Sequence, residues 1–341
     1  MGVGLTPILE RRRSSLKALK GKSFAIDASI EIHRFLALIR KSDGTLFTDQ
    51  SGRPTSHLMG LLTWTSRLIT EFSMRLIFVF DGPPNPLKRK TLEARRMLRQ
   101  KAESEYSQAV SEGDYSRAWS KAVMTGRVTR DILEDSKRLL SMMGVEWLDA
   151  PEDAEAQASN MARKGDVWAV GSKDYDCLLY GGPILARYLS IAGQEFLPAQ
   201  RRSRRLVPEI IKLSENLQRL GIDREQLVDL AILVGTDFNE GVRGIGPKKA
   251  LALIRKYGSL EELPEATKNQ LPQNIDEIRN VFLQPKVLEA ITSNNSKPDP
   301  QGMVEFLVSE RAFSLDRVST IAEKLVRSYE HRELGLTKWL S

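Results

Sequence analysis

The sequence predicts an α/β fold with a mostly parallel central sheet flanked by helices. Three runs with the composition of β-strands lie at residues 23–26, 75–80 and 167–170. The segments between them carry apolar residues with the period of a helix. Strands that alternate with helices usually pair in parallel, and the helices then cover both faces of the sheet.

The rest of the chain has a different pattern. Residues 87–130 are polar, which predicts helix outside the core, and their first part is crowded with basic residues: Lys88, Arg89, Lys90, Arg95, Arg96, Arg99 and Lys101. From residue 208 onward the pattern is helical almost throughout, with a turn at residues 243–249 between two apolar helices. We therefore divide the chain into residues 1–86, 87–130, 131–240 and 241–330, with a tail at 331–341.

Composition narrows the class of protein. The 51 Lys and Arg residues exceed the 44 Asp and Glu residues, and the net charge of +7 favours polyanionic partners. The single cysteine, Cys177, excludes an intramolecular disulfide, and no apolar run is long enough for a membrane span. We expect an intracellular monomer without membrane association.

An aspartate follows each predicted strand. Asp27 and Asp81 come directly after the first two, and Asp174 with Asp176 follows the third. In open parallel sheets ligands bind at the carboxyl ends of the strands, so these four side chains should converge. Three further carboxylates that follow apolar segments complete a candidate set of seven: Asp153, Glu155 and Asp237.

Such a cluster predicts bound metal ions. Carboxylates about 4 Å apart repel by about 4 kcal/mol per pair at an effective dielectric constant of about 20. An oxygen-rich ligand set in a chain with 3 histidines favours Mg²⁺, or Mn²⁺ in its place, over zinc. Two such ions suit the hydrolysis of a phosphodiester. Each aspartate alone could equally be a helix cap or turn residue, and Asp174-Tyr175-Asp176 alone would also suit a phosphatase or a transferase.

Two basic features point to nucleic acid. Lys88 and Arg95 lie seven residues apart on one helix face shortly after Asp81, so both could reach a phosphate held by the metals. A solvated helix face is the alternative. The turn at residues 243–249 could hold a DNA phosphate through backbone N–H groups and nearby lysines, and the alternative is a plain interhelical turn. Its candidate DNA contacts are Gly244, Gly246, Lys248 and Lys249.

At this point the sequence resembles the flap endonuclease family of structure-specific 5′-nucleases, most closely its archaeal and eukaryotic members. The shared blocks run in order over nearly the whole chain: Met1-Gly2-Val3, Ala25-Ile26-Asp27-Ala28-Ser29, Thr55-Ser56-His57-Leu58-Met59-Gly60, Val79-Phe80-Asp81-Gly82, Asp149-Ala150-Pro151, Asp174-Tyr175-Asp176-Cys177-Leu178 and Gly235-Thr236-Asp237 through Lys248. Chance does not explain so many ordered blocks.

The resemblance implies a function and a role for each candidate residue. It implies a two-metal site at the seven carboxylates, with Asp27, Asp81, Asp174, Lys88 and Arg95 taking part in catalysis, and a helical gateway that clamps a single-stranded 5′ flap. It implies that the 243–249 turn is a helix-two-turn-helix element that grips duplex DNA, often with a bound K⁺. It implies flap cutting with 5′→3′ exonuclease activity, in Okazaki-fragment maturation and base excision repair.

Further contacts follow from the same resemblance. A pocket for a short 3′ flap is expected at Thr55, Arg311 and Phe313, and Gly2, His33 and Arg40 are expected to contact DNA near the active site. The end of the chain has the spacing of a sliding-clamp motif, which would bind the clamp (PCNA) through Leu336, Trp339 and Leu340.

Several positions depart from the family pattern. Asp153 replaces a glutamate, which shortens one ligand arm, and His33 replaces a tyrosine that stacks on a base. In the clamp motif Glu333 replaces a glutamine, and Leu340 replaces an aromatic residue. Residues 9–22 form a shorter segment than in the family.

Three other functions were weighed. The family's bubble-cutting repair nuclease and mismatch-repair exonuclease usually carry long insertions or tails that 341 residues cannot hold. A silent DNA-binding scaffold would not need seven retained carboxylates. A phosphatase or transferase built around Asp174 leaves the basic stretch and the 243–249 turn unexplained.

Overall fold

A seven-stranded sheet lies at the centre of the computed structural model, in the order β1-β9-β6-β5-β2-β3-β4. The structure describes residues 3–189, 194–197, 202–289 and 297–340. Within these ranges, the side chains are described for all residues except 194–197, 202–205 and 334–340. The strands of this sheet are β1 (Arg12–Arg13), β2 (Ser23–Asp27), β3 (Arg75–Phe80), β4 (Glu146–Asp149), β5 (Ala169–Gly171), β6 (Ile184–Arg187) and β9 (Glu209–Lys212). A separate hairpin pairs β7 (Gln194–Leu197) with β8 (Arg202–Arg205).

The central strands are parallel, which confirms the predicted fold class. β2 pairs in parallel with β3 and β5, β3 with β4, and β5 with β6. Only the edge is antiparallel, where β9 pairs with β6 and β1 pairs with β9. Their parallel pairing places the carboxyl ends of β2, β3 and β5 at one edge of the sheet.

Helices cover both faces of the sheet, as the alternation of side chains along its strands requires. On β2, Phe24 and Ile26 pack into one apolar cluster, and Ala25 between them packs into the other. The cluster around Phe24 includes α1 (Ala28–Leu38), α2 (Ser56–Phe72), α5 (Arg130–Met142) and α14 (Leu315–Leu340). The cluster around Ala25 includes α6 (Ala154–Lys164), α7 (Asp176–Leu179), α8 (Leu213–Leu220) and α9 (Arg224–Val234).

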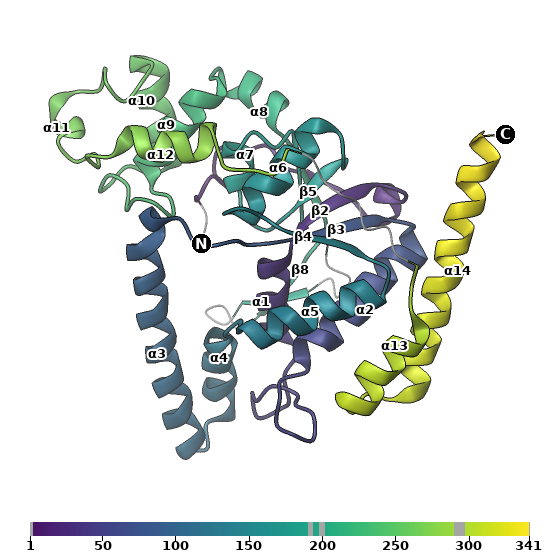
Figure 1. The fold of residues 1–341 in the computed structure, drawn as a ribbon. Helices are drawn as coiled ribbons and strands as arrows, with labels where there is room; N and C mark the ends of the chain where they lie inside the picture. The colour runs from purple at the N-terminus through teal and green to yellow at the C-terminus, as the bar shows by residue number, and fades with distance from the viewer. Residues whose placement is uncertain (1–2, 190–193, 198–201, 290–296, 341) are drawn as a thin grey trace.

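Two long helices stand away from the sheet within the segment predicted as polar helix. Figure 1 shows α3 (Arg89–Ser111) and α4 (Tyr115–Thr125) side by side as a pair that projects from the body of the molecule. On α3 only Ala102 and Ala109 are buried, so most of its surface faces solvent. The base of α3 lies next to the end of β3, and this places its first residues near Asp81.

From residue 208 onward the described part of the chain is helical apart from one strand. The helices α10 (Pro247–Tyr257), α11 (Glu265–Lys268) and α12 (Ile275–Leu283) gather beside α9, and α13 (Pro300–Val304) leads through a π-helical segment (Glu305–Glu310) into α14. The exception to the helical pattern is β9, which joins the main sheet. Its four residues are too few for periodicity to distinguish a strand from a helix, and its pairing with β6 decides its conformation.

Among the residues that the structure describes, no helix has both the length and the apolar character that crossing a bilayer requires. Two 3₁₀ segments, Lys17–Leu19 and Pro86–Lys88, complete the regular structure described here.

Candidate metal centre and nucleic-acid interface

Asp27 and Asp81 lie together at the carboxyl ends of neighbouring strands. Asp27 is the last residue of β2, and its Oδ1 accepts a hydrogen bond from the backbone N–H of Ile30 at 2.9 Å, which caps α1. Asp81 follows β3, and its Oδ1 accepts from the backbone N–H of Ala154 at 2.9 Å. The alternative prediction, that an aspartate of this set caps a helix, is therefore correct for one oxygen of Asp27. Such a cap uses one carboxylate oxygen and leaves the second available to other ligands.

The backbone around Asp81 is fixed by close packing. A Cβ atom on Gly82 would lie 2.2 Å from the carbonyl oxygen of Ala150, so only glycine fits where the chain leaves β3. The backbone N–H of Gly82 also donates to the carbonyl of Glu152 at 2.7 Å. These contacts hold Asp81 against the turn that enters α6 with Asp153 and Glu155.

Asp174 and Asp176 lie in the bend between β5 and α7. The hydroxyl of Ser172 accepts from the backbone N–H of Asp174 at 3.2 Å and donates to Glu155 Oε1 at 2.6 Å. The backbone N–H of Val3 donates to Asp176 Oδ1 at 2.8 Å. The bend is therefore tied both to α6 and to the N-terminal segment.

The seven carboxylates lie close enough together for their charges to act on one another. Burial raises the pKa of Asp27 well above its usual value, and the charges of Asp81, Asp174 and Asp153 raise it further. Burial and the charges of Asp176, Asp174 and Asp27 do the same to the pKa of Glu155. Burial raises the pKa of Asp176 to about 7, with contributions from Asp237 and Asp174. All seven predicted ligands thus belong to one electrostatic cluster.

Two members of this cluster pair with the predicted gateway residues. Lys88 Nζ donates to Asp153 Oδ1 at 2.5 Å, and Arg95 Nη2 bonds to both carboxylate oxygens of Asp237 at 2.7 and 2.6 Å. Burial acts to lower the pKa of Lys88, but the charge and hydrogen bond of Asp153, together with the charges of Asp237 and Asp81, raise the pKa above its usual value. The base of α3 therefore lies directly on the acidic edge of the sheet.

The residues present fit divalent metal ions. No group of three or more histidine, cysteine, aspartate or glutamate side chains in the described ranges forms a ready-made ion site, and Asp153 and Asp237 are turned toward Lys88 and Arg95. Even so, buried carboxylates whose pKa values are raised by mutual repulsion form a site that cations would stabilise. The donors are oxygens, which suits Mg²⁺ or Mn²⁺.

His33 lies on α1, and Arg40 follows the end of that helix, in different surroundings. Burial of its ring by surrounding atoms, together with the charge of Arg99, lowers the pKa of His33 and so favours the neutral imidazole. Arg40 is half-buried, and its Nη1 donates to the carbonyl of Gly44 at 2.8 Å. The Nε and Nη2 atoms of Arg40 are buried without a hydrogen-bond partner among the described residues.

The turn between α9 and α10 is open on its outer side. Gly244 has a φ of +79°, a conformation that favours glycine, and a Cβ at Gly244 or Gly246 would meet no atom within 4 Å. Lys248 and Lys249 are exposed, and Lys249 Nζ donates to the carbonyl of Gly244 at 3.1 Å. A ligand can therefore approach the backbone at the start of α10, where N–H groups point outward.

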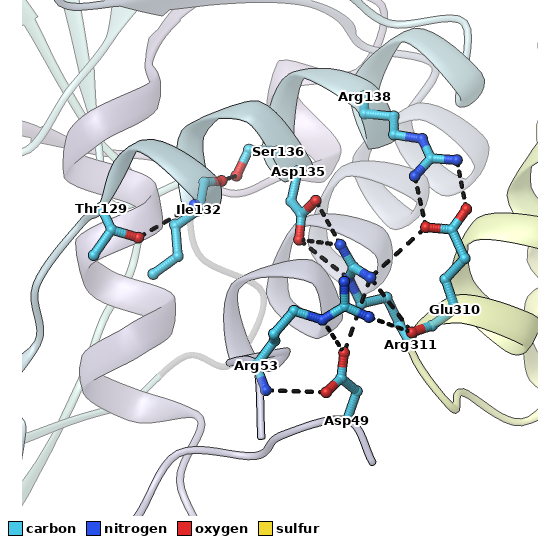
Figure 2. Close-up of polar contacts among 9 residues, drawn as sticks. All are labelled: Asp49, Arg53, Thr129, Ile132, Asp135, Ser136, Arg138, Glu310 and Arg311. Atoms are coloured by element: carbon cyan, nitrogen blue, oxygen red, sulfur yellow. Dashed lines mark hydrogen bonds and ion pairs between the residues drawn. The ribbon is translucent and has the colours of Figure 1, made fainter. Parts of the chain in front are cut away.

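Thr55 and Arg311, two of the three residues predicted for a 3′-flap pocket, are buried. Figure 2 shows Arg311 with its guanidinium against Asp135, where Nη2 bonds to both carboxylate oxygens at 2.8 and 2.9 Å, and Asp49 lies 3.9 Å away. Arg53, two residues before Thr55, bonds to Asp49 at 2.7 Å and to the carbonyl of Glu310 at 3.1 Å. The exposed fraction of Thr55 is 3% and that of Arg311 is 6%.

This arrangement shows what a DNA strand would meet there. Arg138 also pairs with Glu310 at 2.6 Å, so the turn before Arg311 is held on two sides (Figure 2). Phe313 is half-buried against the cluster that includes α2 and α14. Contact of DNA with these residues stays a prediction, and it would require Arg311 to exchange its carboxylate partners for a phosphate.

Two predicted contact regions lie wholly or partly outside the described residues. Gly2 is outside them. The backbone of the predicted clamp motif continues α14 to Leu340, whereas the side chains of Leu336, Trp339 and Leu340 are outside the described part.

Several side chains that hold the cluster were not predicted from the sequence. The hydroxyl of Tyr180 donates to Asp153 Oδ2 at 2.7 Å, and the hydroxyl of Thr91 donates to the carbonyl of Asp237 at 2.8 Å. The hydrogen bond from the hydroxyl of Ser172 to Glu155 was not predicted either. Ser172 and Tyr180 lie within eight residues of Asp174, so proximity in sequence was the available clue, but no spacing rule connects them to their partners.

Comparison with known proteins agrees with this arrangement. Residues 1–102 match the XPG N-terminal domain family, and residues 144–237 match the XPG I-region family. Flap endonuclease 1 of Methanothrix thermoacetophila is 44% identical over 340 residues, which are 100% of each chain. The solved structure of flap endonuclease-1 from Methanococcus jannaschii has a TM-score of 0.75 and 37% identity, with 97% of this chain and 100% of that chain covered.

A more distant structure shares the fold alone. The catalytic core of Rad2 in complex with DNA substrate has a TM-score of 0.68 and 22% identity, and the match covers 94% of this chain and 97% of that chain. The likeness therefore extends over both the sheet and the helical half.

Proposed function

Since this chain belongs to the flap endonuclease family of structure-specific nucleases that act on DNA, we propose that it cuts 5′ flaps near their junction with duplex DNA by a two-metal mechanism. The observation that carries the proposal is the single acidic cluster at the carboxyl ends of β2, β3 and β5, with two basic side chains of the projecting helix resting on it.

Asp27, Asp81, Asp153, Glu155, Asp174, Asp176 and Asp237 are the residues that would hold two Mg²⁺ ions, and Mn²⁺ would serve as a substitute. Bound there, the ions would supply an activated water and stabilise the attacking and leaving oxygens of an in-line displacement. The protein supplies fixed carboxylates and excludes bulk water from the buried part of the cluster, where Asp27 is 4% exposed. Asp27, Asp81 and Asp174 come from the three central strands and define the reaction centre.

Lys88 and Arg95 are placed to bind the phosphate that is cut. Both side chains reach the acidic cluster from the base of α3, and both carry a positive charge there. A phosphodiester that enters between them and the carboxylates would replace Asp153 and Asp237 as their partners. The developing negative charge in the transition state would then be stabilised by two positioned donors.

The open turn at Gly244 and Gly246 would hold the duplex. Backbone N–H groups and the exposed Lys248 and Lys249 suit a phosphate contact that positions DNA without reading its sequence. A K⁺ ion bound by this turn would strengthen the contact. His33 and Arg40 would contact the strand near the cut, and Thr55, Arg311 and Phe313 would receive a short 3′ flap. The cellular roles we propose are Okazaki-fragment maturation and base excision repair, with the protein acting as a monomer.

A substrate panel tests this function. End-labelled double-flap DNA is incubated with the protein beside matched single-stranded, blunt and bubble substrates, in Mg²⁺, Ca²⁺ or EDTA. We expect cutting of the flap near its junction in Mg²⁺, with shorter products from 5′→3′ exonuclease activity, and none in Ca²⁺ or EDTA. Cleavage that survives EDTA would contradict the metal mechanism, and preference for the bubble would assign the other branch of the superfamily.

The raised pKa values in the cluster predict how the stabilisation of the fold by Mg²⁺ depends on pH. A carboxyl group whose pKa is raised in the folded state stabilises the protein below its unfolded pKa and loses that contribution as pH rises through the folded pKa. For Asp176 this window runs from about 4 to about 7, and Asp27 and Glu155 shift in the same direction. In EDTA the cluster should therefore destabilise the fold progressively across this range.

Mg²⁺ binds the ionised carboxylates and should remove that destabilisation. We expect the increase in thermal midpoint on replacing EDTA with Mg²⁺ to be several degrees larger at about pH 8 than at about pH 5. Differential scanning fluorimetry at the two pH values measures it. An increase of equal size at both values would show that the ions bind elsewhere.

The sliding clamp is the proposed protein partner, through Leu336, Trp339 and Leu340. We expect Trp339→Ala to abolish stimulation of flap cutting by the clamp and to leave the rate without clamp within about twofold, because one buried aromatic residue usually carries much of such an interface. Cleavage rates with and without purified clamp measure this, and Lys338→Ala is the matched control in the same helix. Undiminished stimulation of Trp339→Ala would rule out this tail as the clamp site.

A further inference from the structure

Arg187, a buried arginine, contacts the bend between β5 and α7 that carries Asp174 and Asp176. Arg187 is the last residue of β6 and is 6% exposed. Its Nε donates to the carbonyl oxygen of Lys173 at 2.8 Å, and its Nη1 donates to the hydroxyl oxygen of Tyr175 at 2.5 Å. Lys173 and Tyr175 flank Asp174, so one guanidinium group spans the bend at the position of Asp174.

Other contacts fix the guanidinium itself. Glu209, which lies directly opposite Arg187 in the pairing of β6 with β9, places Oε2 at 3.2 Å from Nη1. The hydroxyl of Tyr188 accepts from Nη2 at 2.9 Å, and Arg11 pairs with the other oxygen of Glu209 at 2.9 Å. A buried charge is tolerated when it is paired and its donors are bonded, and here both conditions hold.

Tyr175 connects this arginine to the N-terminal segment. The tyrosine is 4% exposed, its hydroxyl lies 3.0 Å from the hydroxyl of Thr6, and its ring lies 4.2 Å from the guanidinium carbon of Arg187. Three residues before Thr6, the N–H of Val3 bonds to Asp176. The bend is therefore held from one side by β6 and from the other by residues 3–6.

From this geometry we propose that Arg187, acting through Lys173 and Tyr175, is a positioning residue that sets the orientation of Asp174 and Asp176 in the metal centre. The proposal rests on the proposed two-metal function. The residues between β5 and α7 lie outside regular secondary structure, so their geometry depends on contacts such as these. Arg187 touches neither the substrate nor the reacting atoms.

Lysine cannot replace arginine in this role. The guanidinium donates in two fixed directions at once, whereas an ammonium on a flexible stem cannot span Lys173 and Tyr175 with the same geometry. Loss of an outer contact that orients a metal ligand usually weakens metal binding by about 10-fold to 100-fold. We expect Arg187→Lys to weaken Mn²⁺ binding by about tenfold and Tyr175→Phe, which removes one bond only, by about threefold.

Electron paramagnetic resonance of free Mn²⁺ measures this without DNA and without activity. The protein is titrated with Mn²⁺, and the dissociation constant is compared among wild type, Arg187→Lys, Tyr175→Phe, Arg279→Lys and Asp174→Ala. Arg279 is the matched control because it too is ion-paired with carboxylates, Asp229 at 2.6 Å and Glu261 at 2.6 Å, but in the C-terminal helices. Circular dichroism confirms that each variant is folded at the temperature used.

The possible results distinguish the positioning role of Arg187 from the proposed metal site itself. Weaker Mn²⁺ binding in Arg187→Lys and Tyr175→Phe, with Arg279→Lys like wild type, supports the positioning role. Wild-type binding in both variants overturns it, as does equal weakening in Arg279→Lys, which would indicate general destabilisation. If Arg187→Lys does not fold, Tyr175→Phe decides alone. If wild type binds Mn²⁺ no better than Asp174→Ala, the proposed metal site fails, whatever Arg187 does.

Discussion

Asp174→Ala is expected to abolish flap cleavage while the protein still binds flap DNA. Asp174 follows β5 in the acidic cluster, and its charge acts on Asp27, Glu155 and Asp176. Removal of one essential group from a catalytic set costs about 10⁴-fold to 10⁶-fold in rate. DNA affinity should change by less than about threefold, because phosphate contacts elsewhere on the protein supply most of it.

Single-turnover cleavage and a gel-shift titration in Ca²⁺ measure the two effects separately. Asp166→Ala is the matched control, since Asp166 is exposed and lies before β5, at the opposite end of the strand that leads to Asp174. It should cut at the wild-type rate. An Asp174→Ala protein that retains more than about a tenth of the wild-type rate would remove this residue from the catalytic set.

Lys88→Met is expected to lower the rate of cleavage by about 10²-fold to 10³-fold and to leave metal binding intact. A positioned donor that stabilises transition-state charge is worth this much in other enzymes. The structure adds a second expectation. Because Lys88 bonds to Asp153 at 2.5 Å, its removal frees a carboxylate, so Mn²⁺ affinity should equal or exceed that of wild type.

Lys90→Met provides the control for charge, because Lys90 is an exposed residue in the first turn of α3, two residues after Lys88. Single-turnover rates and Mn²⁺ titrations are measured on both variants. A Lys88→Met protein that cuts at the rate of Lys90→Met would show that Lys88 has no catalytic role. A protein that loses Mn²⁺ binding would show that Lys88 supports the site rather than the substrate.

The parts of the fold that could be predicted share one physical origin. Strands β2 and β3 are buried on both faces, so their apolar runs are visible in the sequence, and their parallel pairing follows from the helices between them. That pairing alone brings Asp27 and Asp81 together. The predicted convergence of the carboxylates therefore depended on topology, which sequence patterns express well.

The contacts that shape the cluster could not be predicted in the same way. Arg187 and Glu209 meet because β9 returns antiparallel to β6, and four residues are too few to reveal that strand. Tyr180 reaches Asp153 across α6 and α7, and no periodicity encodes such a pair. Arg311 was expected to be available to DNA, but Asp135 and Asp49, both distant in sequence, surround its guanidinium.

The structure shows the partners of Asp153, the aspartate that replaces a glutamate of the family pattern. Its shorter side chain begins α6 without a capping bond, and its two oxygens bond to Lys88 and Tyr180 instead. Asp153 thus ties Lys88, at the base of α3, to the acidic edge, as Asp237 ties Arg95. This was not foreseeable from the substitution alone.

The central claim is that metal ions are held where β2, β3 and β5 end, under the base of α3. Anomalous scattering from Mn²⁺ in a crystal of the protein with flap DNA tests it most directly. We predict two peaks, within coordination distance of Asp27, Asp81, Asp174 and their neighbours in the cluster, with the flap junction against Lys88 and Arg95. Peaks away from these carboxylates, or a junction bound elsewhere on the surface, would contradict the account.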